Sequence, residues 1–258
     1  MAYWQSRIAK AQDLISQKNR KQIDRALRKY YKTTAEGIIE DFEATYNKIL
    51  ATVQDGREPT PADLYKLDKY WQMQAQVDKK LKDLNERQVR KLTRAFRQQY
   101  KDIYNSIAVK GLEAYSTIDD DAIAQVINHI WVADGKSWSQ RIWENSALLK
   151  TTLNEELIHC VASGRPPSYL KKVLMNRFNV SFGRADALVR TELAHIQTKA
   201  AQQRYQDYGV QQLEILADKD ERQCDVCGKL HKTRYGINDQ LPIPAHPKCR
   251  CCVVPVVD

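Results

Sequence analysis

The chain has 258 residues, of which 43% are hydrophobic and 28% charged, so it can bury a core as one large or two small domains. Its apolar runs are only a few residues long, so we expect no helix that spans a bilayer and no membrane partner. No apolar segment follows the polar start of the chain. We therefore expect no secretory signal, reduced thiols and no disulfide framework.

The net charge of +9 is concentrated in two segments. Residues 1–32 and residues 79–101 each carry nine lysines and arginines against two acidic residues. Such segments predict an anionic partner, with nucleic acid ahead of an acidic protein surface. The alternative is that they are solvated faces of amphipathic helices. The candidate contact residues are Arg7, Lys18, Arg20, Lys21, Arg25, Arg28, Lys79, Lys80, Lys82, Arg87, Arg90, Lys91 and Arg94.

Residues 1–115 are predicted to form an elongated basic helical arm. Apolar side chains follow helical spacing from Trp4 to Ile49, and glycine and proline then end this helix. Thr60, followed by proline and an acidic residue, is typical of a helix start. A second apolar stripe continues from there towards Gly111, so we expect two long helices in a hairpin.

Residues 116–209 are predicted to form a helical body. Aspartates at a helix start, serine caps and glycine or proline breaks divide this region into shorter helices. We expect these helices to begin near Asp119, Trp138, Ser168 and Ser181, with a turn at Asp134-Gly135 and a last helix end at Gly209.

Residues 210–258 are predicted to form a small α+β module. The segment 210–216 has the composition of a strand, and so does Cys252–Val257, where Pro255 favours a position at the sheet edge. The expected fold class is therefore mainly α, with a long N-terminal helical arm, a helical body and a small cysteine-rich α+β module.

Five cysteines gather in this module, with His246 among them. Cys224 and Cys227 have the C-x2-C spacing at which a tight turn directs two thiolates to one metal ion. Cys249 and either Cys251 or His246 could complete a tetrahedral structural zinc site. The alternative is a set of free thiols packed in a small core, with His246 bonded to backbone. The spacing also leaves open which residue completes the site and what Cys252 does.

Two catalytic interpretations fit less well, so we expect no enzyme. A metal-dependent nuclease of the HNH type needs a histidine base and further ligands, and only His231 and His246 are at hand. A cysteine nucleophile needs a nearby base, whereas thiols this crowded would sooner share a metal ion.

Three motifs carry a resemblance to a known family. They are Leu188-Val189-Arg190-Thr191-Glu192, Asp218-x-Asp220-x-Arg222-x-Cys224-x2-Cys227, and Pro244-x-His246-Pro247-x-Cys249-Arg250-Cys251-x3-Pro255. In these the chain resembles the minor head proteins of tailed bacteriophages, the Mu F-like head-morphogenesis family.

The resemblance implies a virion component that is not an enzyme and that lies inside the capsid near the portal vertex after assembly in the host cytoplasm. The implied partners are the portal protein, double-stranded phage DNA, and scaffolding or other head proteins. The implied roles are head morphogenesis and genome packaging and ejection.

Charged residues of the first two motifs are predicted to pair. Glu192 lies near the start of a predicted helix, and Arg190 can pair with it or with the acidic loop that carries Asp218 and Asp220. Solvated charges are the alternative.

A zinc-dependent nucleic-acid-binding protein of cellular origin remains a competing function. Such a protein would concentrate basic and aromatic residues on its zinc module. Here the approach to the cysteines is acidic and the basic segments lie far upstream, which favours the head-protein interpretation.

Overall fold

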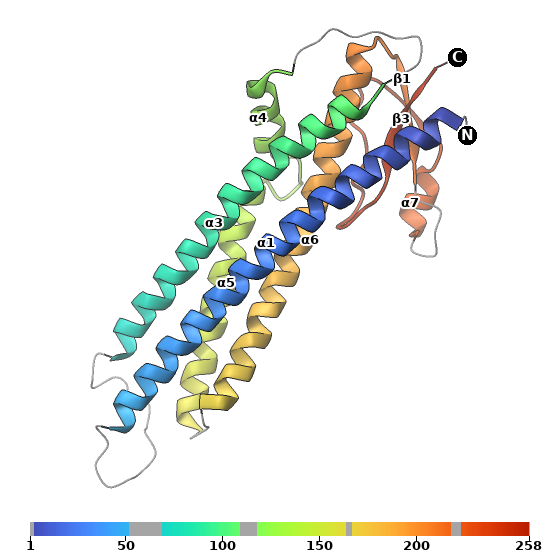
Figure 1. The fold of residues 1–258 in the computed structure, drawn as a ribbon. Helices are drawn as coiled ribbons and strands as arrows, with labels where there is room; N and C mark the ends of the chain where they lie inside the picture. The colour runs from blue at the N-terminus through green and yellow to red at the C-terminus, as the bar shows by residue number, and fades with distance from the viewer. Residues whose placement is uncertain (1–2, 52–68, 109–117, 164–166, 218–222, 258) are drawn as a thin grey trace. The chain divides into compact units, whose positions relative to one another are not determined.

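The computed structural model describes residues 3–51, 69–108, 118–163, 167–217 and 223–257 (Figure 1). In chain order the elements are helices α1 (Tyr3–Leu50), α3 (Lys69–Ser106), α4 (Asp120–Asn128), α5 (Trp138–Ala162) and α6 (Pro167–Asp207), strand β1 (Gln212–Leu216), helix α7 (Asp225–Leu230), and strands β2 (Arg234–Gly236) and β3 (Cys252–Val256). The strands form one antiparallel sheet in the order β2-β1-β3. The predicted fold class, mainly α with a small C-terminal α+β module, is confirmed.

The chain forms two compact units, each built from segments far apart in the sequence. The module unit contains Met1–Asp24, Lys91–Trp138 and Asp186–Asp258, and the bundle unit contains Arg25–Arg90 and Ser139–Ala185. The predicted division into an arm, a body and a module at residues 115 and 209 stays a prediction. Within the described ranges, no helix is both long and apolar enough to cross a membrane.

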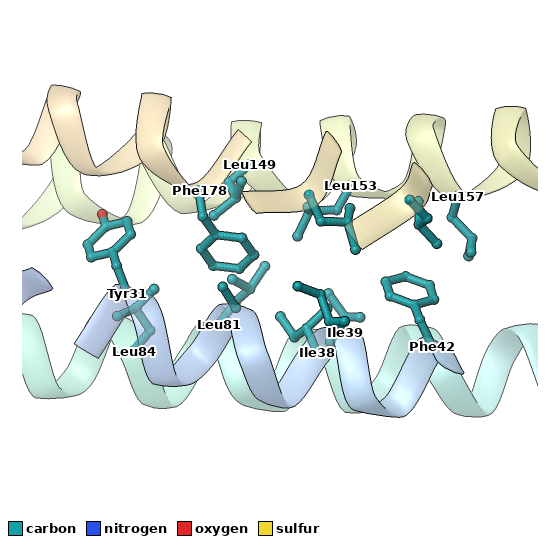
Figure 2. Close-up of a cluster of buried hydrophobic side chains, with 14 of the residues drawn as sticks. Tyr31, Ile38, Ile39, Phe42, Leu81, Leu84, Leu149, Leu153, Leu157 and Phe178 are labelled. Carbon is teal, nitrogen blue, oxygen red and sulfur yellow. The ribbon is translucent and has the colours of Figure 1, made fainter. Parts of the chain in front are cut away.

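Apolar side chains from four helices form the core of the bundle unit. Figure 2 shows side chains of α1 and α3 pointing towards those of α5 and α6. The labelled residues are Tyr31, Ile38, Ile39 and Phe42 of α1, Leu81 and Leu84 of α3, Leu149, Leu153 and Leu157 of α5, and Phe178 of α6. Leu81 and Leu84 are three residues apart, and Leu149, Leu153 and Leu157 are four apart, spacings that place side chains on one face of a helix.

The sheet of the module unit packs beside the first turns of α1 (Figure 1). The predicted strands are confirmed, and Leu213 of the central strand β1 lies opposite Pro255 of β3. Because β3 is an edge strand, Pro255 occupies the predicted edge position. Gln5 Nε2 donates to the carbonyl of Pro255 at 3.3 Å, which joins α1 to this edge.

A chain of polar hydrogen bonds crosses the module unit. The side chain of Asn19 donates to Gln99 at 2.9 Å, Gln99 donates to Ser16 at 2.6 Å, and Ser16 donates to Gln197 at 2.5 Å. Gln197 in turn donates to Gln12 at 3.2 Å.

This chain continues to the sheet. Gln12 donates to the hydroxyl of Tyr205 at 3.3 Å, and Tyr205 donates to the carbonyl of Val253 at 3.3 Å. Gln12 and Tyr205 are fully buried, so each bond replaces one that water would otherwise make. The network thus joins α1, α3, α6 and β3.

Several predicted helix ends are confirmed and one is wrong. Asp119 caps α4 by accepting a hydrogen bond from the backbone of Asp121 at 3.0 Å, and Gly135 and Gly209 have the positive φ that their turns require. The predicted helix start at Ser181 is wrong, because α6 runs unbroken through it. Ser181 is buried, and its carbonyl accepts a hydrogen bond from Asn145. The predicted start at Thr60 lies outside the described residues.

Candidate metal centre

The first two candidate ligands sit at the start of α7. Cys224 is the N-cap of this helix, and its sulfur accepts a hydrogen bond from the backbone N–H of Cys227 at 3.4 Å. A sulfur at the N-cap lies beside the side chain one turn later, so the C-x2-C spacing brings both thiols to the same side of the turn.

The other candidates lie on the loop that leads into β3. His246 accepts a backbone hydrogen bond from Cys249 at 3.1 Å, and Lys248 between them has a φ of 65°. This second turn is anchored on α6, because the backbone N–H of Lys248 donates to the hydroxyl of Thr191 at 3.2 Å. Thr191 belongs to the Leu188–Glu192 motif, so the motif helix supports the loop that carries the ligands.

The two turns bring the candidate ligand atoms together. His246 Nε2 lies 3.3 Å from the sulfur of Cys224 and 3.1 Å from that of Cys227. The sulfurs of Cys227 and Cys249 are 3.7 Å apart. With Zn–S bonds of about 2.3 Å, tetrahedral geometry separates two sulfur ligands by about 3.8 Å, and a sulfur and an imidazole nitrogen by about 3.5 Å. These three separations are close to those between pairs of ligands on a tetrahedral metal ion.

Two groups of three residues share Cys227. Cys224, Cys227 and His246 form one group, and Cys227, Cys249 and Cys251 form the other, with ligand atoms in each group within 4.8 Å of one another. All five predicted ligand residues thus lie in one cluster that could hold a metal ion. Zinc binding itself stays a prediction.

The orientation of the His246 ring suits metal binding. Its Nδ1 lies 2.9 Å from the carbonyl oxygen of Pro247, which can only accept a hydrogen bond. Nδ1 therefore carries the proton, and the lone pair of Nε2 faces the thiols. A backbone carbonyl that fixes the tautomer in this way is typical of histidine ligands.

The thiols of the cluster have pKa values shifted in opposite directions. A hydrogen bond from Cys251 lowers the pKa of Cys249 to about 5, and the backbone N–H of Cys227 lowers the pKa of Cys224. Burial raises the pKa of Cys227 to about 12. The hydrogen bond to Cys249, together with burial, raises the pKa of Cys251. A second buried thiolate beside Cys249 thus needs a compensating cation, which a bound metal would supply.

Two neighbouring residues stand apart from these groups. Cys252 is buried at the start of β3 and, within the described residues, belongs to neither ligand group. His231 accepts a hydrogen bond from the backbone N–H of Ala217 at 3.2 Å through Nδ1, so it supports the end of β1.

The family comparison covers this whole arrangement. Residues 151–254 match the family model of Phage Mu protein F like protein. This segment is Mu F-like. The resemblance predicted from the motifs is thus confirmed, and the family is one of phage head morphogenesis. Searches of curated proteins and of solved structures gave no significant match.

The Mu F-like segment places its charged motif residues as follows. Arg190 pairs with Asp186, one turn earlier in α6, at 2.9 Å. Glu192 lies well inside α6, so its predicted place near a helix start is wrong. It is buried and accepts a hydrogen bond from the indole of Trp131 at 3.1 Å. Asp218 and Asp220 lie outside the described residues, so their pairing with Arg190 stays a prediction. Asp186 was not among the predicted partners of Arg190, although its i, i+4 spacing from Arg190 is a visible signal.

The candidate nucleic-acid residues upstream of the Mu F-like segment fall in both units. The module unit holds Arg7, Lys18, Arg20, Lys21, Lys91 and Arg94, and the bundle unit holds Arg25, Arg28, Lys79, Lys80, Lys82, Arg87 and Arg90.

Some of these side chains also have structural contacts. Lys80 pairs with Asp41 at 2.9 Å and donates to the carbonyl of Gly37, and Arg28 lies over the ring of Phe182 at 4.5 Å. Lys18, Lys79 and Lys82 are exposed. DNA contact by the set stays a prediction.

Proposed function

We propose that the chain is a minor head protein of a tailed bacteriophage that acts in head morphogenesis without catalysing a reaction. The observation that carries this proposal is the Mu F-like match over residues 151–254, which contains α6, the sheet and the whole cysteine cluster. In this proposal the protein lies inside the capsid near the portal vertex after assembly in the host cytoplasm. Its partners are the portal protein, other head proteins and the packaged DNA.

The proposed role of the metal centre is structural. Zinc bound by Cys224, Cys227, His246 and Cys249 would join the start of α7 to the loop before β3. A three-stranded sheet with strands of five, three and five residues buries little by itself, and a closed tetrahedral zinc site can supply the missing stability. Cys251, hydrogen-bonded to Cys249, would then orient a ligand rather than bind the metal.

The proposed role of the basic segments is to contact DNA or an acidic partner surface. Exposed lysines and arginines on α1 and α3 present positive charge over many helical turns. Contacts of this kind follow phosphates rather than base sequence, which suits a protein packaged with a whole genome. Genome packaging and ejection are the steps in which such DNA contacts would act.

Co-expression with the cognate portal protein tests this function. Size-exclusion chromatography followed by native mass spectrometry should show copies bound to the portal ring, with one zinc-sized mass per chain lost on chelation. A protein that stays off the portal ring and elutes with nucleic acid would contradict the head-protein proposal and favour a cellular zinc-dependent binder. Cleavage of DNA by the wild type that is lost in His246→Ala would contradict the non-catalytic role.

A further inference from the structure

A groove of about 710 Å³ lies in the module unit between the first half of α1 and the cysteine-rich loop. One wall is α1 from Ser6 to Lys21. The facing wall combines α6, at Arg190 to Gln197, with the loop segment 248–252. The groove therefore has one face upstream of the Mu F-like segment and one face within it.

Positive charge dominates the lining of this groove. Its described lining residues include six cationic side chains against one acidic side chain, that of Asp13. The six are Lys10, Arg20, Lys21, Arg190, Lys248 and Arg250. Only two of them, Arg20 and Lys21, were among the contact residues expected from the sequence. The charge segments of the sequence could not reveal this set, because half of it comes from α6 and the loop.

The length of the basic wall suits a duplex. Lys10 and Lys21 are separated by eleven helical steps, which corresponds to roughly 16 Å along α1. Each strand of duplex DNA carries one phosphate per about 3.4 Å of the axis, so a wall of this length spans about five phosphates of one strand. Ser6 and Gln17 add neutral polar groups of the kind that contact phosphate oxygens.

The lining also disfavours recognition of bases. Sites for single strands stack the bases on aromatic rings. Among the described lining residues the only ring side chain is His231, which accepts the hydrogen bond from Ala217. The groove thus offers charge and hydrogen bonds for a phosphate backbone and no stacking platform for exposed bases.

We propose that this groove binds the phosphate backbone of double-stranded DNA without sequence preference. This inference rests on the proposed DNA contact, and it moves that contact from the helix faces to a groove with two walls. Lys248 and Arg250 flank Cys249, so the turn that presents a ligand to the metal centre also presents both cations to the groove. The hydrogen bond from the backbone of Lys248 to Thr191 anchors this part of the groove lining on α6.

A matched pair of double variants of the full chain tests the groove. Lys10→Gln with Lys248→Gln removes one cation from each wall. Lys48→Gln with Lys232→Gln removes one exposed lysine from α1 and one from the module, both outside the groove. Lys232 matches Lys248 closely, since both are exposed and have φ near 65°. The measurement is the affinity for a short labelled DNA duplex of random sequence over a series of salt concentrations.

The slope of log affinity against log salt is the readout. Each lost phosphate contact should reduce its magnitude by about 0.9, so the groove variant should lose about 2 and the control variant nothing. Thermal melting of both variants checks that they fold. If the double groove variant does not fold, Lys10→Gln is compared with Lys48→Gln, with an expected slope change of about 1.

Three results would overturn the inference, and each has a different meaning. An equal loss of slope in both variants would mean that DNA contact stands but is spread over the surface. Wild-type binding to polyglutamate and not to the duplex would mean that the groove takes an acidic polypeptide. No wild-type binding to either would remove the proposed DNA contact itself.

Discussion

The bundle unit and the module unit bury the same two long helices, α1 and α6, in different ways. In the bundle unit both helices contribute apolar side chains to one continuous cluster (Figure 2). In the module unit, Gln12, Ser16 and Asn19 of α1 occupy the corresponding inward positions and hydrogen-bond to α3 and α6. An apolar cluster tolerates small shifts, whereas a hydrogen-bond chain requires one arrangement of its members. We infer that the module unit adds directional hydrogen bonds to its own buried apolar residues, such as Phe96, Leu193 and Leu213.

Removal of the metal should have the largest effect and should act on one unit alone. Structural zinc contributes about 10–16 kcal/mol in small zinc-dependent domains, so its loss should unfold the cysteine-rich region. After chelation, hydrogen-exchange mass spectrometry should show amides of residues 223–257 losing protection while those of Arg25–Arg90 keep it. Equal loss in both units would mean that the two units unfold together.

Substitution of single cysteines sharpens this test. Cys227→Ser should abolish zinc binding, because Cys227 belongs to both ligand groups. Cys252→Ser makes the same chemical change at a buried thiol outside both groups and should keep one zinc per chain. Zinc content of the purified proteins measures this directly, and equal zinc loss in the two variants would contradict the proposed ligand set.

A core truncation should weaken the bundle unit by a smaller amount. Leu153 is fully buried on α5, and Leu153→Ala should cost about 2–5 kcal/mol because it leaves a cavity between helices. Leu148→Ala is the control on the same helix, since Leu148 is 48% exposed and the change should cost less than about 0.5 kcal/mol. Urea unfolding measures both. Similar costs would mean that the cluster in Figure 2 does not stabilise the bundle unit.

These differences explain what the sequence could predict. Helical periodicity identified the apolar faces, and the cysteine spacing identified the ligand cluster, because both signals are local. The stripe on α1 was followed only through apolar residues, so Gln12 and Asn19, which continue the spacing between Ile8 and Ile23, were missed although both are buried. The signal was present as a polar continuation of the same face.

The supports of the candidate metal centre were not predictable in the same way. The hydrogen bond from Lys248 to Thr191 joins residues far apart in the chain. The groove also combines distant segments, because its lining comes from α1, α6 and the loop before β3. Such contacts depend on how the elements pack, and no short motif encodes them. The break expected at Ser181 failed for a related reason, because burial of that serine against Asn145 outweighed its capping preference.

The smallest expected effect concerns a buried histidine of the module unit. The ring of His195 stacks on that of Trp131 with their centroids 4.4 Å apart, and its Nε2 has no hydrogen-bond partner among the described residues. Burial, followed by the nearby charges of Lys199 and His129, lowers the pKa of His195 to about 3. Below about pH 6.5 the imidazole of His195 binds a proton in the unfolded chain but not in the folded chain. The contribution of this group to stability is therefore full above that pH and falls as the pH decreases.

At a pH near 5, His195 alone should lower the free energy of unfolding by about 2 kcal/mol relative to neutral pH. His195→Phe keeps a ring on Trp131 and removes the titration, so the variant should lose less stability than the wild type between neutral and mildly acidic pH. His159→Phe, at an exposed position of α5, should leave the wild-type pH dependence unchanged. Urea midpoints at the two pH values provide the comparison. An identical pH dependence in His195→Phe and wild type would mean that the acid sensitivity of the module unit arises elsewhere, in the polar network or the thiol cluster.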